Sequence, residues 1–253
     1  MTGWPPAGWE QHEVPHGGHR HAYYVLGDSD APGVLLLHEF PGVNAALVRF
    51  AGELAERFRV TVPSIVGRDG RPSTPGTVAR LCVRREVHFF RTGRTSPAVP
   101  WLRTLFDEVV ARGEDRPCGV VGMCMTGGFA LALAVDPRVR AAVVAQPAAP
   151  AAAVGRLPFA DRRHWAADLG LGEDDRAALC ARTDLRVRGY RYDGDPLSPP
   201  ERLQAAEDLL GADRLHVTTF DPPVPKAHST LTGEERHPGA VAEVVAFLTE
   251  RLG

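Results

Sequence analysis

Residues 119–135 read GVVGMCMTGGFALALAV, an apolar run that leads through a cysteine into a series of small residues. The first part has the composition of a short buried strand, and the part that begins near Thr126 has the composition of a helix. Cys124 therefore lies on the predicted turn between strand and helix. Gly122 before it and Gly127 after it permit a sharp turn. Thr126 stands where glycine is more usual, so we expect the turn to be less sharp.

A cysteine at such a turn has a chemical use. A nucleophile held between a strand and a helix projects its side chain clear of the backbone, and the helix N-terminus behind it stabilises negative charge. A cysteine in this setting can also be a small buried hydrophobe. Cys124 is thus a candidate nucleophile whose case depends on partners elsewhere in the chain.

Strand-like and helix-like segments alternate on both sides of this turn. The pattern predicts strands at 22–27, 33–40, 58–64, 118–123, 139–146, 185–192 and 214–220. It predicts helices at 47–58, 100–113, from about 126, at 199–211 and at 240–252. Short apolar strands that alternate with amphipathic helices favour an α/β fold with a mostly parallel sheet covered by helices on both faces. Such sheets bind their ligands at the carboxyl ends of the strands.

Length and charge limit the classes of protein. A chain of 253 residues with 44% hydrophobic residues can form one domain spanning 1–253, with a lid or insertion expected around 147–183. The net charge of −2 and the interspersed charged residues predict no nucleic-acid partner. The N-terminal region does not resemble a signal peptide and no run has the length of a membrane span, so we expect a soluble cytoplasmic protein without a membrane partner.

The cysteines and histidines do not form a recognisable metal motif. Four cysteines lack a Cys-x-x-Cys pair, which predicts free thiols rather than a zinc site or a disulfide framework. Clustered histidines lie near the N-terminus without accompanying cysteine or a HExxH frame: His12, His16, His19 and His21. We therefore expect no metal site.

The nucleophile predicts an acid and then a histidine further along the chain. An aspartate follows a predicted strand in the segment RYDGDPLSPP (191–200), where either Asp193 or Asp195 could orient an imidazole. His228 lies in KAHSTLT (226–232), just past the last predicted strand. His38 is expected to be a structural residue at a strand end, with hydrogen bonds to the backbone.

These residues resemble the dienelactone hydrolases, cysteine-dependent members of the α/β-hydrolase fold. The resemblance spans roughly residues 20–250 and is carried by LLLHEFPG (35–42), GMCMTGG (122–128), GDPLSPP (194–200) and AHSTLT (227–232). It implies that Cys124 is the nucleophile and His228 the base and acid. It also favours Asp195 over Asp193 as the residue that orients His228, because the PLSPP that follows Asp195 then matches the family pattern.

The resemblance implies further roles. Glu39 stands in the place of the family's glutamate that modulates the cysteine, and the backbone N–H groups of Phe40 and Met125 would form the oxyanion hole. If Glu39 lies beside Cys124, the thiol would stay protonated until substrate displaces the carboxylate. The implied reaction is hydrolysis of an ester or lactone through a thioester, without a metal or organic cofactor.

The chain departs from the family at the arginines that hold the carboxylate of dienelactone. The position four residues after the catalytic histidine is Thr232 rather than arginine. The second arginine could correspond to Arg84 or Arg85. The sequence therefore predicts a small ester or lactone as the substrate and leaves dienelactone itself open, together with the oligomeric state.

Two other functions are compatible with the sequence. A non-catalytic binding protein would keep the pocket but not turnover, and a redox-responsive protein would use Cys124 as a sensor thiol. Cys118 lies at the far end of the same predicted strand, about 20 Å away, so a direct Cys118–Cys124 disulfide is not expected. Cys82 and Cys180 remain possible partners.

Overall fold

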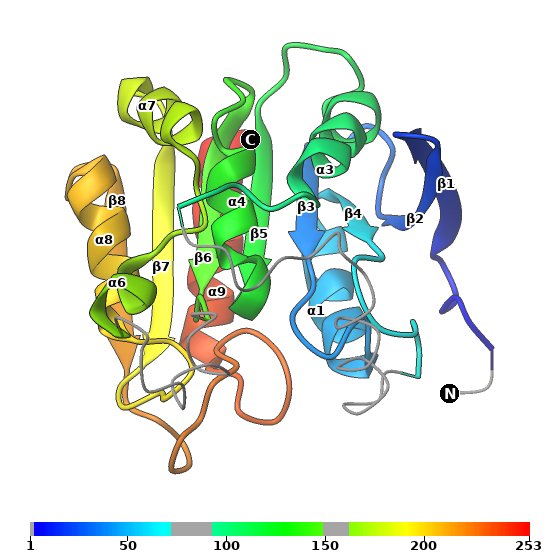
Figure 1. Cartoon of the computed structure of the whole chain (residues 1–253). Coiled ribbons are helices and arrows are strands. Elements are labelled where there is room, and N and C mark those ends of the chain that lie inside the picture. Colours follow the sequence, from blue (N-terminus) through cyan, green and yellow to red (C-terminus); the bar gives the residue numbers. More distant parts are fainter. Residues whose placement is uncertain (1–2, 72–92, 149–161) are drawn as a thin grey trace.

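The computed structural model describes residues 3–71, 93–148 and 162–253. Their strands form an eight-stranded sheet in the order β1-β2-β4-β3-β5-β6-β7-β8 (Figure 1). The strands are β1 (Glu10–His16), β2 (His19–Leu26), β3 (Gly33–Leu37), β4 (Arg59–Pro63), β5 (Cys118–Met123), β6 (Val139–Ala145), β7 (Arg186–Tyr192) and β8 (Leu215–Phe220). Strands β3 to β8 pair in parallel, whereas β1 and β2 are antiparallel to their neighbours. The mostly parallel sheet is as predicted.

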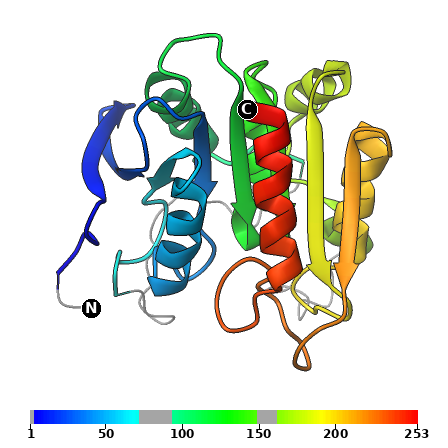
Figure 2. The ribbon, with the colours of Figure 1, turned by 180° about the vertical axis from the view of Figure 1, so that it is seen from behind.

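Helices cover both faces of the sheet. They are α1 (Ala45–Ala55), α3 (Val99–Leu105), α4 (Gly127–Leu133), α6 (Arg162–Ala167), α7 (Glu173–Ala181), α8 (Pro200–Leu210) and α9 (Pro238–Leu252). Helices α1 and α9 lie on one face, which is turned toward the viewer in Figure 2. Helices α3, α4, α7 and α8 lie on the other face (Figure 1).

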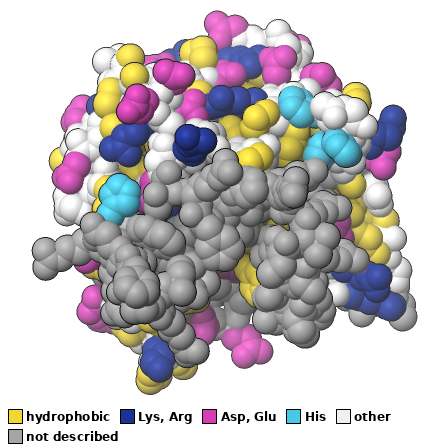
Figure 3. All heavy atoms as spheres, in the orientation of Figure 1, with side chains coloured by type: hydrophobic (Ala, Val, Ile, Leu, Met, Phe, Trp, Pro, Cys, Tyr) yellow, Lys and Arg dark blue, Asp and Glu magenta, His cyan; other side chains and the backbone are white. Residues whose placement is uncertain are grey.

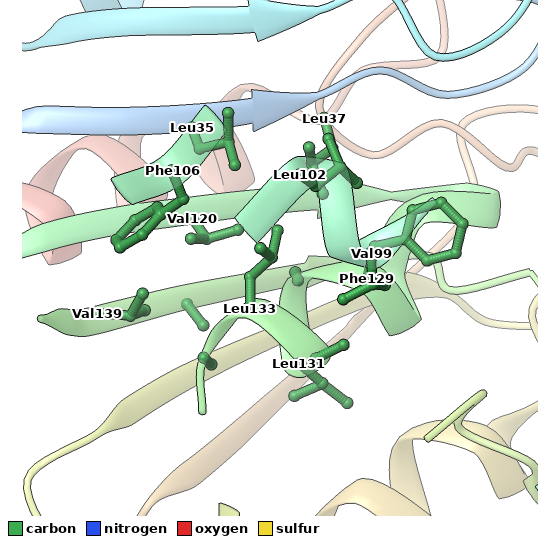
Figure 4. Packing of buried hydrophobic residues seen from close by; sticks show 14 of the residues in the cluster. Leu35, Leu37, Val99, Leu102, Phe106, Val120, Phe129, Leu131, Leu133 and Val139 are labelled. Carbon is green, nitrogen blue, oxygen red and sulfur yellow. The ribbon is translucent and has the colours of Figure 1, made fainter. Parts of the chain in front are cut away.

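The residues of β3 show why the sheet is buried on both sides. All five residues of this strand are buried. Val34 and Leu36 pack on the side of α1 and α9, and Leu35 and Leu37 pack on the side of α3 and α4. A strand with helices on both faces needs apolar side chains at every position, which produces a continuous apolar run. Figure 4 shows the α3 and α4 side of this packing, where Leu102 lies near Leu37.

Helix boundaries follow from capping and from the path of the chain. The side chain of Asn44 accepts hydrogen bonds from the backbone N–H groups of Ala46 and Leu47, both at 2.9 Å, and caps α1. The prediction extended this helix to 58, but it ends at Ala55 because the chain must turn to enter β4. The predicted helix at 100–113 is α3 followed by a π-helical turn at Phe106–Val110.

The sequence pattern did not predict the first strand, β1. It forms a hairpin with β2 at the edge of the sheet, and Val14 is its one buried residue. Without alternating apolar positions it has no period-two signal. The four N-terminal histidines lie on this hairpin, and the ring of His21 stacks on Trp101 with centroids 4.3 Å apart. Within the described residues, no group of three or more potential ligands is arranged to hold a metal ion.

Of the expected lid or insertion at 147–183, residues 149–161 lie outside the described part of the chain, and the remainder contains α6 and α7. None of the described helices combines the length and the apolarity that a membrane span requires. Where described side chains are visible in Figure 3, acidic and basic groups are interspersed over that face.

Candidate active site

Cys124 occupies the tight connection between β5 and α4. Its backbone has φ of 52°, a left-handed conformation that is uncommon for residues other than glycine. Its side chain is partly exposed, and the thiol is free. Holding a residue in such a sparsely populated conformation costs about 1–3 kcal/mol of folding free energy, and such residues are concentrated at functional sites. Cys124 therefore has the backbone geometry expected of a nucleophile on a strand-to-helix turn.

Two neighbours hold this turn in place. A Cβ atom at Gly122 would lie 2.5 Å from the carbonyl oxygen of Thr126 and 2.8 Å from Cβ of Ala130, so only glycine fits there. The Thr126 hydroxyl accepts a hydrogen bond from the N–H of Met123 at 3.0 Å and lies 2.9 Å from the Met123 carbonyl oxygen. The hydroxyl of Thr126, which follows Cys124, is thus joined to the backbone of Met123, which precedes it.

His228 and Asp195 come together at the carboxyl edge of the sheet. Nδ1 of His228 lies 2.7 Å from Oδ2 of Asp195, whose side chain is fully buried. The other carboxylate oxygen of Asp195 accepts from the N–H of Leu197 at 2.9 Å, which fixes the plane of the group. Asp193, the alternative, has a side chain that is 76% exposed and lies 3.8 Å from Arg191. The structure thus pairs His228 with Asp195.

The surroundings of His228 favour its protonated form. Burial of the ring lowers its pKa, but hydrogen bonding to Asp195 and the proximity of Cys124 outweigh that effect and raise the pKa of His228 to about 10. Nε2 of His228 is buried and has no partner with hydrogen-bond geometry among the described residues. Cys124 is therefore close enough to raise the pKa of the imidazole, although no hydrogen bond of standard geometry joins the two side chains. In sites without substrate, catalytic hydrogen bonds are often long or poorly aligned.

Glu39 follows β3 and is buried at the same edge of the sheet. Within the described chain, three side chains donate hydrogen bonds to its carboxylate. Ser229 donates to Oε2 at 3.0 Å, Gln146 donates to Oε2 at 3.3 Å, and Thr232 donates to Oε1. Two of these donors belong to the loop that carries His228. The carboxylate is thereby fixed between the strand end and the histidine loop.

Gln146, which the sequence did not indicate as a site residue, connects the end of β3 to the loop that carries His228. It is fully buried directly after β6. Its Oε1 accepts from the backbone N–H of Thr230 at 3.2 Å and from the Thr230 hydroxyl, while its amide donates to Glu39. In the sequence, Gln146 is visible only as a polar residue at the end of an apolar strand. That position does not show which groups its side chain hydrogen-bonds.

Glu235 closes the loop that carries His228 and was also not selected. Its Oε2 accepts from the backbone N–H of His228 at 2.8 Å and of Ser229 at 3.3 Å. The Tyr192 hydroxyl donates to the Glu235 carbonyl oxygen. Side chains and backbone of the loop thus keep the imidazole over the end of the sheet.

His38 has the structural role expected from the sequence. Its Nδ1 donates to the carbonyl oxygen of Glu39 at 3.0 Å, and its Nε2 accepts from the N–H groups of Ile65 and Val66 at 3.0 and 3.3 Å. Burial lowers the pKa of His38, in agreement with a neutral ring in this arrangement. His38 is therefore held by the backbone and is not available as a base.

The other predicted residues divide into two groups. Phe40 lies three residues beyond β3, the strand that pairs with β5, and Met125 directly follows Cys124. Arg84 and Arg85 lie outside the described residues. The three cysteines in the described part are free, and Cys118 is buried at the opposite end of β5 from Cys124, as expected.

Comparisons with known proteins show the family of the chain. The sequence model of the dienelactone hydrolase family matches residues 21–159, more than half of the chain. Among curated proteins, none matches the chain.

Solved structures show the same fold at low identity. A putative dienelactone hydrolase from Klebsiella pneumoniae is 15% identical with a TM-score of 0.61, covering 96% of this chain and 98% of that one. A putative lipase from Acinetobacter baumannii is 15% identical with a TM-score of 0.63, covering 96% and 92%. A thioesterase domain from the curacin biosynthetic pathway is 16% identical with a TM-score of 0.60, covering 96% and 99%. The fold is that of the α/β hydrolases, as predicted.

Proposed function

Since the chain belongs to the dienelactone hydrolase family, and so is a hydrolase, we propose that it cleaves small carboxylic esters or lactones with the thiol of Cys124. The observation that carries the proposal is the 2.7 Å contact between His228 and buried Asp195 at the edge where Cys124 stands on a left-handed turn. This combination supplies a nucleophile, a base and a group that orients the base.

The proposed reaction has two steps. In the first step the proton of the thiol resides on Nε2 of His228, the sulfur of Cys124 attacks the acyl carbon, and the departing alkoxide receives this proton from His228. This leaves a thioester between Cys124 and the acyl group. Water then attacks the thioester with His228 as base, and the carboxylic acid and the free thiol are released. Asp195 stabilises the imidazolium that forms in each step.

The negative oxygen that forms in each step needs hydrogen-bond donors. We assign this role to the backbone N–H groups of Phe40 and Met125, because Phe40 comes from the loop after β3, the neighbour of β5, and Met125 directly follows the proposed nucleophile. Glu39 is assigned the role of a carboxylate that modulates the thiol, and its three donors support a single position for it in the resting state.

Hydrolysis of a neutral aryl acetate at pH 7 tests the proposal. Wild type should turn over repeatedly, Cys124→Ala should fall to the background rate, and Cys124→Ser should be severely impaired, because an alcohol is a poorer nucleophile in a site built for a thiol. Cys180→Ala is the matched control, since this cysteine is exposed on α7, and it should keep wild-type activity.

Equal rates for wild type and Cys124→Ala would contradict the proposal. In that case a binding protein without turnover, or a protein whose Cys124 responds to oxidants, would be the better account.

A further inference from the structure

A cleft of about 250 Å³ lies at the amino edge of the sheet, between α9 and the first residues of β7 and β8. Figure 2 shows this end of the molecule at the top, where the C-terminus of α9 (red) lies beside the starts of β7 (yellow) and β8 (orange). Cys124 and His228 lie at the opposite, carboxyl edge, and the seven residues of β7 separate the two edges by roughly 20 Å. The cleft is therefore separate from the proposed catalytic group.

Four arginines line this cleft: Arg186, Arg188, Arg214 and Arg251. Arg186 and Arg188 are two residues apart on β7, so their side chains lie on the same face of the sheet, while Val187 between them packs on the opposite face. Arg214 directly precedes β8, and Arg251 belongs to the last turn of α9. The fold thus brings cationic side chains from three segments of the chain to one place.

The lining of the cleft carries more positive than negative charge. Two carboxylates, Asp213 and Glu250, also line it, so the arginines exceed the carboxylates by two charges. Among the described residues, none of the four arginines forms an ion pair with a carboxylate. The backbone carbonyl of Asp184 accepts from Nη2 of Arg251 at 3.2 Å, but its carboxylate is paired with two arginines outside the cleft. The described chain therefore leaves the excess positive charge without a partner.

Uncharged groups hold the guanidinium groups in place. Nη1 of Arg186 donates to two backbone carbonyl oxygens, both at 2.9 Å, and Nε and Nη1 of Arg214 donate to four others. The guanidinium of Arg188 lies over the ring of Phe247, 5.4 Å from its centroid. Side chains that are already fixed lose less conformational entropy when a ligand binds. The cations of the cleft are therefore arranged before a ligand arrives.

Each of these arginines also keeps guanidinium nitrogens free for a ligand. Within the described chain, the nitrogens without a hydrogen bond include Nη2 of Arg186, Nη2 of Arg214, Nη1 of Arg251 and all three nitrogens of Arg188. None of these nitrogens is buried. The cleft therefore presents unpaired N–H donors of four cations to solvent.

We propose that this cleft binds a phosphate dianion, either free or carried as a monoester by a compact molecule. A phosphate group has a charge of about −1.5 to −2 at pH 7 and three acceptor oxygens, which matches the excess of two positive charges. Guanidinium groups pair with phosphate oxygens through two parallel N–H donors. A single carboxylate has one charge and two oxygens, so it would leave part of the excess uncompensated. The volume of the cleft restricts the ligand to a small molecule.

Isothermal titration calorimetry of the full chain tests this at pH 7, in a buffer without phosphate and at constant ionic strength. The probes are inorganic phosphate and glucose 6-phosphate, and glucose is the uncharged control. We expect saturable binding of a phosphate probe at one site per chain and no binding of glucose. Tighter binding of inorganic phosphate would identify the free ion as the ligand, and tighter binding of the ester would identify a phosphorylated molecule. The absence of binding by both phosphate probes would overturn the proposal.

Arg188→Met locates the binding site. Methionine keeps an apolar contact with Phe247 but removes the charge, so the affinity for the phosphate probe should fall about tenfold or more. Arg49→Met is the matched control, because Arg49 is an exposed arginine of α1 on the same face of the sheet and outside the cleft. Its loss removes the same charge, but salt screens distant charges, so the affinity should stay within about twofold of wild type. Equal losses in the two variants would indicate general attraction by charge and overturn the proposal.

Glu250→Gln gives a second test with the opposite sign, and it decides the question even if Arg188→Met does not fold. Glu250 is an exposed residue of α9 and one of the two carboxylates of the cleft. Its neutralisation removes a repulsion of the anion, so the phosphate probe should bind about threefold more tightly or better. Unchanged or weaker binding by this variant would contradict the proposal. None of these measurements involves Cys124, so they stand apart from the test of the proposed hydrolysis.

Discussion

At the residue scale, the candidate site depends on the particular aspartate that reaches His228. The Asp195 carboxylate makes one contact to the imidazole and one to the N–H of Leu197, so it has little freedom to rotate. A buried carboxylate hydrogen-bonded in this way holds one tautomer of the ring and stabilises its protonated form. Asp193, two residues earlier, makes its contact in solvent.

The two aspartates allow a matched pair of substitutions. Asp195→Asn should lower kcat for the aryl acetate by about 10²–10⁴-fold, because an amide cannot stabilise the imidazolium that forms in the reaction. Asp193→Asn should stay within about twofold of wild type. Similar losses in both variants would contradict the assignment of Asp195.

At the scale of elements, the site is formed by loops at one edge of the sheet. Figure 1 shows that the segment after β8, in orange, lies along this edge below β6 and β7. Glu39 follows β3, Cys124 follows β5, Gln146 follows β6 and Asp195 follows β7. Parallel strands bring their carboxyl ends to the same edge, so residues far apart in the sequence become neighbours.

The close packing behind Cys124 predicts that any side chain at Gly122 lowers the stability of the fold. Gly122→Ala should lower the free energy of unfolding by about 2–3 kcal/mol, since the added methyl group would overlap the backbone of Thr126. Gly52→Ala is the control in urea denaturation. Gly52 is an exposed residue of α1 with no atom near its Cβ position, and alanine there should stabilise by about 0.5–1 kcal/mol. Tolerance of alanine at Gly122 would contradict the geometry of the turn.

The connection made by Gln146 predicts coupled effects on stability and activity. Gln146→Leu leaves the N–H of Thr230 and the carboxylate of Glu39 each without one partner, which should cost about 2–3 kcal/mol of unfolding free energy. The histidine loop should also be less well placed, so kcat should fall more than KM rises. Gln204→Leu, at an exposed amide of α8, should change neither quantity noticeably. An active, fully stable Gln146→Leu would exclude the connecting role.

At the scale of the whole molecule, the raised pKa of His228 links stability to pH. The folded protein holds this proton up to a pKa of about 10, whereas the unfolded chain releases it near 6.5. The stabilisation from the protonated pair is therefore complete below about pH 6.5 and is lost as the pH rises toward 10.

Urea unfolding between pH 6 and pH 10 measures this effect. The free energy of unfolding of wild type should exceed that of His228→Gln by about 1–3 kcal/mol at pH 6, and the difference should shrink as the pH rises. The comparison cancels the titration of groups that the two proteins share. A difference that stays constant over this range would mean that the imidazole gains no proton affinity on folding.

The sequence by itself determined the alternation of strands and helices and the order of Cys124, Asp195 and His228 along the chain. The central strands are buried on both faces, so each is a continuous apolar run. Such a run can be recognised from the local sequence alone. The edge strand β1 was not predicted, because Val14 is its one buried residue and the strand therefore has no periodic apolar pattern. The hydrogen bonds of Thr126 to Met123 could not be predicted either, since they depend on the direction in which its hydroxyl points.

Only the tertiary structure decided which polar groups meet. Glu39 receives its hydrogen bonds from residues 107, 190 and 193 positions further along the chain, and Nη2 of Arg202 lies 3.8 Å from the Cβ position of Gly128 in another element. A buried polar group must find its partner wherever the fold places a donor, and that choice depends on which loop ends converge at the edge of the sheet. Local periodicity reports burial of a side chain, but it contains no information about the partner across the site.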